Sequence, residues 1–480
     1  MFVENPSKKF QLITLVMIMF AAGAFASNNK ELSGEVIKNI RSDFRMNTQT
    51  RAMYNAISNT DIKSLALNRD LLRDHNEFYS NKIKIKTVTN QRSSGRCWLF
   101  ATLNILRPQI IEKNKLDDFQ FSHIYLSFWD KMEKANTFYE RIIRFRQRKL
   151  MDREVISILH NPISDGGYWE NGKDLIEKYG VVPNEVMPET NSSNSTKTMN
   201  KVLERKLRVD AAKLRKMAEK GTPVGKLRKA KEKMLGEVYR ILVMNLGQPP
   251  VKFDWRYQPK AKKDDAKDAK KDEGHKDKSI VIKDYTPKQF YDEFVGLDLD
   301  EYVDLANAAP HKLSKLYQVS LTKNIIAGHD LGFANVSMET MKSIAIKSIK
   351  DGTVVWFSAD VGVDQNSTKG IMAGSLYDYE TLFGINLKMS RAELALYRQS
   401  APTHAMSLTG VDIQNDKPVK WLVENSWGTA RGNKGFWTMY DDWFDTNVFS
   451  VIVKKKYVPK NVLEIFEQDP IILPVWDPMW

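Results

Sequence analysis

Apolar residues recur with the spacing of an α-helix through much of the first half of the chain. Three such segments are 97–106, 121–150 and 170–179. The first is apolar on most faces, so we predict a buried helix that begins at Cys97 and is limited by Pro108. The last is followed by Gly180, and glycine is the residue type that commonly ends a helix.

Between 197 and 243 the pattern stays helical, but the polar positions become basic. Gly221-Thr222-Pro223 interrupts the run, so we predict two amphipathic helices packed antiparallel. Residues 251–257 alternate like a strand that could pair with 279–285. The Lys/Asp/Ala-rich stretch 259–278 between them has no large apolar residue, so we expect a solvated, disordered loop.

Strand patterns dominate the last part of the chain. Four segments are typical of strands: 354–359, 404–413, 420–424 and 435–440. Because helices come first and strands follow, without an internal repeat, the order indicates an α+β protein with two lobes.

Composition adds size and charge to this picture. The chain has 480 residues, 42% of them hydrophobic and 28% charged, which is typical of a globular protein with two or three domains. Its net charge of +14 lies almost entirely in 197–278, which holds 25 basic and 12 acidic residues. A protein that binds nucleic acid over its whole surface is therefore disfavoured.

The first residues have the features of an export signal. Lys8-Lys9 precedes an uncharged, mainly apolar run at 10–26 that ends in Ala24-Phe25-Ala26. We predict a signal peptide at 1–26 and an exported protein, periplasmic or secreted. The alternative is an uncleaved membrane anchor, for which the apolar run is short.

Cys97 is the single cysteine, which excludes an intrachain disulfide and a cysteine-based zinc site. At the first turn of a helix, the helix dipole stabilises a thiolate and lowers the pKa of the thiol. A nucleophilic thiolate also needs a group that accepts and returns a proton, usually histidine. Five of the seven histidines are most simply surface residues and His123 packs in a helix, whereas His404 stands at the mouth of a predicted strand, where it can project into a cleft.

Two further residues complete the candidate site. Asn425 follows the next predicted strand, and its amide oxygen can accept a hydrogen bond from the imidazole while Trp427 shields that bond from water. Gln91 lies six residues before Cys97, so its side-chain N–H and the Cys97 backbone N–H can together form an oxyanion hole. Neither an HExxH motif nor a cluster of carboxylates and histidines indicates a metal, and no cofactor is expected.

The order Gln91-x5-Cys97-Trp98, His404, Asn425-Ser426-Trp427-Gly428 resembles the papain-like cysteine peptidases, and most closely their bleomycin hydrolase/aminopeptidase C branch. Other segments similar to that branch are Ser94-Gly95-Arg96-Cys97-Trp98-Leu99-Phe100, Glu177-Lys178-Tyr179-Gly180-Val181-Val182-Pro183, Met187-Pro188-Glu189-Thr190, Leu376-Tyr377-Asp378-Tyr379-Glu380 and Pro470-Ile471-Ile472-Leu473-Pro474-Val475-Trp476-Asp477-Pro478. The resemblance runs from about residue 84 to residue 479.

The resemblance implies a papain-like two-lobed fold, with Cys97 on a helical lobe and His404 and Asn425 on a β lobe. It implies peptide hydrolysis through an acyl-enzyme thioester, with Cys97 as nucleophile and His404 as general base and acid. Asn425 would orient the imidazole, and Gln91 would be an oxyanion donor. Gly166-Gly167 resembles the glycine pair whose backbone approaches the bound peptide, and an ordinary loop is the alternative.

These expectations divide the chain into segments. They are a signal peptide at 1–26, an N-terminal arm at 27–85, the helical catalytic lobe at 86–196, a basic helical insertion at 197–330 that contains the 259–278 loop, the β catalytic lobe at 331–460, and a C-terminal tail at 461–480 that reaches toward the active site.

Assembly and cleavage register are also implied by the resemblance. Members form a homohexameric ring, and their C-terminal carboxylate lies in the cleft, where it meets the α-amino group of the substrate. The tail here is shorter by about four residues, or about 13 Å of extended chain, and ends at Trp480. We therefore expect release of short N-terminal peptides or some endopeptidase activity, unless Trp480 fills the vacated cleft.

Two other classes of function stay open beside a peptidase acting on peptides. Residues 197–278 could bind nucleic acid or another anionic surface, with peptidase activity secondary; the nearly charge-balanced loop without aromatic residues favours a plain solvated surface. An inactive structural ring is disfavoured because all four candidate catalytic residues are present.

Overall fold

The computed structural model describes residues 31–260 and 281–479, and these fall into two compact units. The smaller unit combines 31–67 with 378–385. Its helices are α2 (Gly34–Asp43), α3 (Thr48–Asn59), α4 (Ile62–Ala66) and α16 (Tyr379–Phe383). The predicted signal peptide at 1–26, most of the predicted 259–278 loop and Trp480 lie outside the described residues.

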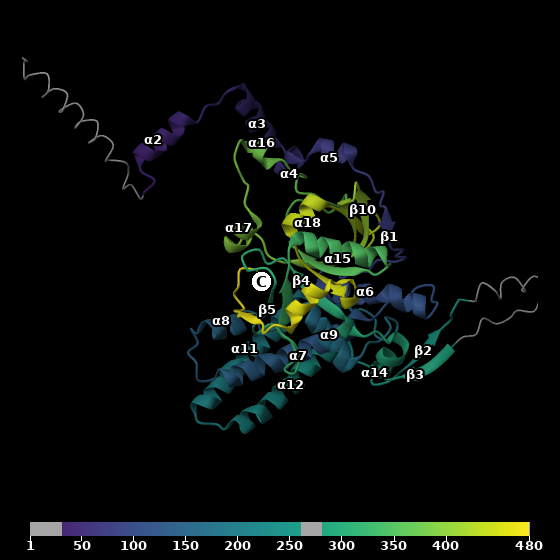
Figure 1. Cartoon of the computed structure of the whole chain (residues 1–480). Helices are drawn as coiled ribbons and strands as arrows, with labels where there is room; N and C mark the ends of the chain where they lie inside the picture. Colours follow the sequence, from purple (N-terminus) through teal and green to yellow (C-terminus); the bar gives the residue numbers. More distant parts are fainter. Residues whose placement is uncertain (1–30, 261–280, 480) are drawn as a thin grey trace, which may run out of the picture. The chain divides into compact units, whose positions relative to one another are not determined.

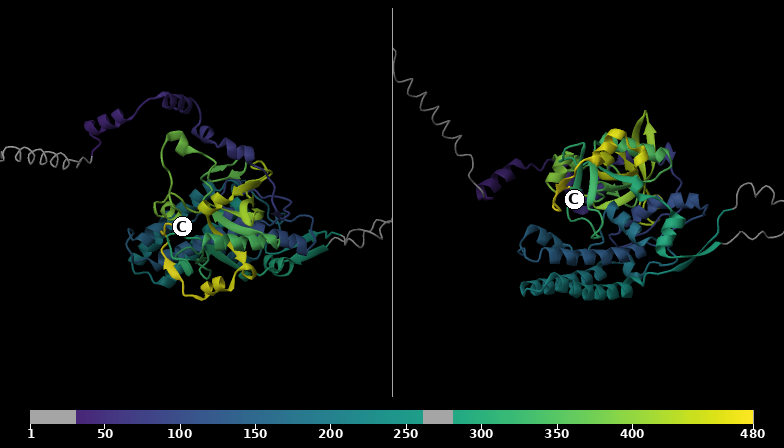
Figure 2. Two further views of the ribbon diagram at one scale, coloured as in Figure 1. Left: turned by 45° about the horizontal axis from the view of Figure 1, so that its top comes forward. Right: turned by 60° about the horizontal axis from the view of Figure 1, so that its bottom comes forward.

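The helices of the larger unit come mainly from the first half of the chain (Figure 1). They are α5 (Arg69–Asp74), α6 (Cys97–Lys113), α7 (His123–Arg144), α8 (Arg153–His160), α9 (Trp169–Tyr179), α10 (Asn191–Asn194), α11 (Lys197–Glu219), α12 (Val224–Leu246) and α14 (Pro287–Gln289), followed later by α15 (Met338–Lys350), α17 (Arg391–Leu396), α18 (Asp441–Asn447) and α19 (Lys460–Leu463). Helices α7, α11 and α12 pack against one another in the blue and teal layer of Figure 2. Helix α6 contacts α7 and the sheet strands β7 and β10.

The helix that begins at Cys97 is confirmed, but the expected limit at Pro108 is wrong, because α6 continues to Lys113. Proline removes one backbone hydrogen bond from the helix interior. Here Leu106 and Ile110, on either side of Pro108, are completely buried, and this apolar burial outweighs the lost bond.

Three other predictions from the pattern are confirmed. The basic segment forms two helices, α11 and α12, interrupted at 221–223. Strands β2 (Phe253–Tyr257) and β3 (Val281–Tyr285) pair antiparallel. Gly180 follows α9 with a left-handed φ of +70°, and its N–H donates to the carbonyl of Ile176.

Most strands of the described chain join one twelve-stranded sheet, in the order β14-β5-β6-β4-β13-β7-β10-β11-β12-β9-β8, with β1 also paired to β10. Their bounds are β1 (Asn81–Lys82), β4 (Tyr302–Ala306), β5 (Lys315–Val319), β6 (Leu331–Asn335), β7 (Val355–Ala359), β8 (Gln365–Asn366), β9 (Ile371–Met372), β10 (His404–Gln414), β11 (Lys417–Glu424), β12 (Phe436–Tyr440), β13 (Val448–Lys454) and β14 (Ile471–Leu473). The four predicted strands are β7, β10, β11 and β12. Strands β4 and β5 come from 197–330, so the segment predicted as a helical insertion also contributes to the sheet.

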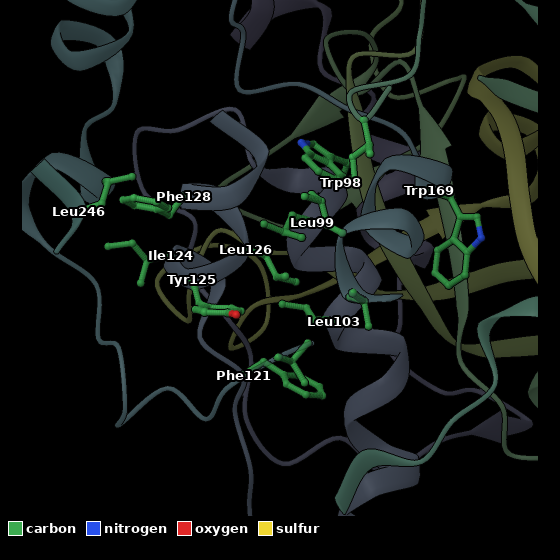
Figure 3. Packing of buried hydrophobic residues seen from close by; sticks show 14 of the residues in the cluster. Trp98, Leu99, Leu103, Phe121, Ile124, Tyr125, Leu126, Phe128, Trp169 and Leu246 are labelled. Carbon is green, nitrogen blue, oxygen red and sulfur yellow. The ribbon is translucent and has the colours of Figure 1, made fainter. Parts of the chain in front are cut away.

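The larger apolar core surrounds α6. Leu99 and Leu103 from α6 lie beside Ile124, Tyr125 and other side chains of α7, as Figure 3 shows. A second core lies between the sheet and α15. The helices and the sheet confirm the predicted α+β class. No helix in the described ranges combines the length and the apolar character needed to cross a membrane.

A buried ion pair ties the helical core to the sheet. The Arg107 guanidinium, on α6, donates to Glu424 Oε1 at 2.6 Å and to the carbonyl of Thr87 at 2.6 Å. Both side chains of the pair are almost fully buried. Burial raises the pKa of Glu424 to about 7, although Arg107 acts in the opposite direction. Glu424 ends β11 directly before Asn425, so this pair fixes the distance between α6 and that strand end.

Removing only one partner of this pair should destabilise the fold strongly. At pH 8, where the Glu424 carboxylate is ionised, we expect Glu424→Ala to lower the free energy of unfolding by about 3–5 kcal/mol, because Arg107 then stays buried without its counter-charge. The double variant Arg107→Met/Glu424→Leu should lose much less, since no charge is left in the core. Denaturant unfolding measures both variants, and equal losses would contradict the structural role assigned to the pair.

Candidate active site

The proposed nucleophile lies at the junction of a loop and a helix. Cys97 is the first residue of α6 and is half-buried, with backbone hydrogen bonds from Trp98 and Ala405 to its sulfur. Burial raises the pKa of the Cys97 thiol, but the charge and hydrogen bond of His404 outweigh this effect, and the net pKa is lowered. The thiolate is therefore stabilised where the sequence places it.

His404 is the first residue of β10, and its ring is held between two partners. Its Nε2 lies 2.9 Å from Asn425 Oδ1, which leaves Nδ1 for the hydrogen bond with Cys97. Burial lowers the pKa of His404. The Cys97 thiolate and the hydrogen bond to Asn425 raise this pKa by more, so the net pKa is above its ordinary value. A lowered thiol pKa and a raised imidazole pKa together favour the thiolate–imidazolium pair.

Asn425 follows β11 and is completely buried. Its Oδ1 also accepts the backbone N–H of Ser426 at 2.8 Å, so the amide cannot turn away from His404. The Trp427 ring lies over the imidazole, with 4.9 Å between ring centroids. Trp427 therefore lies where the sequence analysis expected it, beside the ring that bonds to Asn425.

The loop before Cys97 is bonded directly to the segment after β11. Gln91 N–H donates to the carbonyl of Ser426 at 2.8 Å, and Gly428 N–H donates to the carbonyl of Thr89 at 3.0 Å. The Ser426 hydroxyl also donates to Gln91 Oε1 at 2.6 Å, while Gln91 Nε2 donates to the carbonyl of Ser94. These bonds fix which end of the Gln91 amide is the donor, and they point its N–H side toward the Cys97 loop.

Two ionic contacts that the sequence analysis missed hold the Cys97 loop. The buried Arg96 guanidinium forms a two-point ion pair with Glu189, at 3.0 and 2.8 Å, and donates to Ser94 Oγ at 3.0 Å. On the other side, Asp165 accepts the N–H of Gly95 at 3.1 Å and pairs with buried Lys131 at 2.7 Å. Both acids lie far from the loop in sequence, so no local pattern indicated them.

The glycine pair lies next to the same helix. A Cβ on Gly167 would come within 2.6 Å of the Trp98 ring, so the close approach of this backbone to the indole requires glycine. The carbonyl of Gly166 accepts from Lys134 Nζ at 2.6 Å. The contacts with Trp98 and Lys134 therefore hold the backbone of Gly166 and Gly167 in place, and both residues line the same cleft as Cys97.

These residues line one cleft with a volume of about 980 Å³: Gln91, Cys97, Gly166, Gly167 and His404. The tail contributes Val475 and Trp476 to its lining, although Trp480 lies outside the described residues. His311, which the sequence suggested as a surface residue, instead lies 3.1 Å from the Asp477 carboxylate, and Arg398 donates to the carbonyl of Trp476 at 2.9 Å. Both contacts fix the tail. Three or more metal-binding side chains do not gather anywhere in the described ranges.

A polarised thiol, an imidazole oriented by an amide and donors beside the sulfur define a cysteine peptidase site of the papain type. Comparison with known proteins agrees with this class. The model of the Peptidase C1-like family matches residues 31–480. Aminopeptidase C of Listeria monocytogenes is 39% identical over 453 residues, which cover 94% of this chain and 98% of that protein. Human bleomycin hydrolase is 36% identical over 464 residues, 94% of this chain and 98% of that protein.

A solved structure extends the likeness to three dimensions. The crystal structure of PepW from a Lactobacillus matches with a TM-score of 0.88 at 38% identity, over 94% of this chain and 99% of that one. The chain belongs to the Peptidase C1-like family, and it is a cysteine peptidase with the papain-like fold. The resemblance, the fold class and the enzyme class drawn from the sequence are thereby confirmed.

The paired titration of Cys97 and His404 predicts how the thiol reacts with pH. Because the thiol pKa is lowered from 9.0, alkylation by iodoacetamide should continue at pH values where an ordinary thiol is protonated, and should slow only when acid protonates the thiolate. In His404→Ala the imidazolium is absent, so the apparent thiol pKa should rise. The rate of alkylation across pH measures both proteins, and identical profiles would contradict the pair.

Proposed function

We propose that this chain is an aminopeptidase of the bleomycin hydrolase and aminopeptidase C type, in which Cys97 forms a thioester with the substrate. The observation that supports this most is the arrangement of Cys97 and His404 in the lining of the cleft, with His404 hydrogen-bonded to the buried Asn425. Relatives over nearly the whole chain are named aminopeptidase C and bleomycin hydrolase.

In this mechanism Cys97 Sγ attacks the peptide carbonyl carbon. The backbone N–H of Cys97 and the Nε2–H of Gln91 stabilise the oxyanion that forms. The His404 imidazolium gives its proton to the leaving amine, and the peptide C–N bond breaks. His404 then removes a proton from water, which attacks the thioester and releases the acyl product as a carboxylic acid while Cys97 recovers its starting state. Asn425 keeps Nδ1 directed at the sulfur throughout.

We also propose that the tail sets the cleavage register and permits more than one residue to be removed at once. Val475 and Trp476 line the cleft, and two contacts of the tail, at His311 and Arg398, hold it in place. A cavity of about 980 Å³ is at the upper end of the usual range for ligand sites, so it has room for a dipeptide beside Cys97.

Product analysis on a ten-residue peptide tests activity and register together. We expect single residues and short N-terminal peptides from a free N-terminus, and no products from Cys97→Ala, because that variant has no nucleophile. Mass spectrometry of timed samples identifies each product, and an acetylated copy of the peptide is the control for end recognition. Strict release of single residues would contradict the relaxed register, and an inactive wild-type enzyme would contradict the function.

Export and assembly are further proposals. The sequence of 1–26 favours cleavage after Ala26 and location outside the cytosol, and the resemblance favours a homohexamer. N-terminal sequencing of protein from a bacterial host should begin at Ser27, and light scattering should give six times the mass of one chain. An intact Met1 or a monomeric mass would contradict the respective proposal.

Nucleic-acid contact through 197–278 stays a prediction, and the described contacts give it little support. Arg228 and Lys231 of α12 both pair with Glu140 of α7, so part of the basic charge is compensated within the protein.

A further inference from the structure

An acidic side chain with no catalytic role lines the active-site cleft. Asp304, on β4, is 4% exposed and belongs to the cleft lining together with Ser358 and Ser450. The mechanism above gives it no function, and a buried carboxylate has a high cost unless a partner compensates it.

The sheet register connects Asp304 to the catalytic histidine. Ala405, the residue after His404, pairs with Ser358 of β7, and Ser358 pairs with Ser450 of β13. The two serine hydroxyls lie 2.9 Å apart, and Ser450 is the hydrogen-bond partner of Asp304 on the next strand. The two serines and Asp304 therefore form a row of polar side chains along the cleft wall, which starts on β7, next to the catalytic strand β10.

The carboxyl of Asp304 lacks a cationic partner among the described residues. Its Oδ1 is buried with no hydrogen-bond partner, and no lysine, arginine or histidine side chain of the described ranges forms a salt bridge with it. Glu170, at the start of α9, interacts electrostatically with Asp304, and its Oε2 is also buried without a hydrogen bond. Glu170 also accepts backbone hydrogen bonds from its own N–H and from Gly332. The charge of Asp174 raises the pKa of Glu170, and that of Lys173 lowers it.

The pKa values of Asp304 and Glu170 also indicate that too little positive charge lies near the two acids. Burial raises the pKa of Asp304 well above its ordinary value, and the charge of Glu170 raises it further. Burial likewise raises the pKa of Glu170 to about 8. A cation that entered the cleft would stabilise the ionised form of both acids.

We propose that Asp304, with Glu170 behind it, binds a cationic group of the peptide that is being cleaved. This inference rests on the proposed peptidase function, because the acyl part of the substrate occupies this cleft. Peptides offer two such groups: the side chain of lysine or arginine, and the free α-ammonium of the first residue. Both have the chemistry that a buried carboxylate with one unused oxygen would select.

Matched fluorogenic substrates separate the two sources. Acetyl-Arg-Ala and acetyl-citrulline-Ala amides differ in the side-chain charge alone, and Gly-Ala and acetyl-Gly-Ala amides differ in the terminal charge. The wild-type enzyme should prefer the charged member of at least one pair by about tenfold or more in kcat/KM. Asp304→Asn should reduce that preference to near unity while it still cleaves the neutral substrates.

A control variant tests whether loss of any nearby acid has the same effect. Glu301→Gln removes a charge just before β4, from a side chain that is 54% exposed and outside the cleft, and should keep the preference. Equal preferences in wild type and Asp304→Asn, with neutral substrates still cleaved, would overturn this inference alone. An enzyme that cleaves none of the four substrates would overturn the peptidase function as well.

The inference can be decided even if Asp304→Asn does not fold. The wild-type enzyme alone must then discriminate within one of the pairs. Equal kcat/KM for arginine and citrulline, together with equal kcat/KM for free and acetylated N-termini, would overturn it.

Discussion

The contact between Cys97 and His404 is the interaction on which the rest of the site depends. It joins the first residue of α6 to the first residue of β10, which are 307 positions apart in the chain. Each group shifts the pKa of the other toward the ion pair, and burial opposes both shifts. The pair therefore exists only where the helix and the sheet are held in register at close range.

That register is supplied by hydrogen bonds and an ion pair that lie outside the Cys97–His404 contact. The backbone around Gln91 pairs with the segment around Ser426, so hydrogen bonds hold the oxyanion donor beside the segment that carries Asn425. The buried pair Arg107–Glu424 fixes α6 against the same strand end. Such pairs contribute little net stability when both partners are present, but they penalise any arrangement that separates them. The distance between Cys97 on α6 and Asn425 after β11 therefore depends on the same buried ion pair that holds the helix against the sheet.

The catalytic residues of the site were largely predictable from the sequence, whereas the ion pairs that hold the Cys97 loop were not. Cys97, His404 and Asn425 each stand at the edge of a recognisable element, and Gln91 stands six residues before Cys97 in the preceding loop. A catalytic role needs few residue types, so spacing and element boundaries were sufficient. Asp165 and Glu189 are single acids in loops, and their partners are 34 and 93 positions away. No periodicity marks such long-range ion pairs.

The fold shows the same contrast between local and long-range information. Helices α11 and α12 and the β2–β3 pair follow from local patterns and were predicted. The membership of β4 in the catalytic sheet depends on its pairing with β13, almost 150 residues later, and could not be predicted from alternation alone. Because Asp304 lies on that strand, its place in the cleft became visible only in three dimensions.

Trapping the acyl-enzyme is the most direct test of the central role of Cys97. A slowly hydrolysed peptide ester, mixed with the enzyme and quenched in acid, should leave an acyl group that peptide mapping locates on Cys97, since its thioester is the intermediate. The adduct should disappear on addition of hydroxylamine and should not form in Cys97→Ala. Rapid turnover with an acyl group on another residue, or retained activity in Cys97→Ala, would contradict the account.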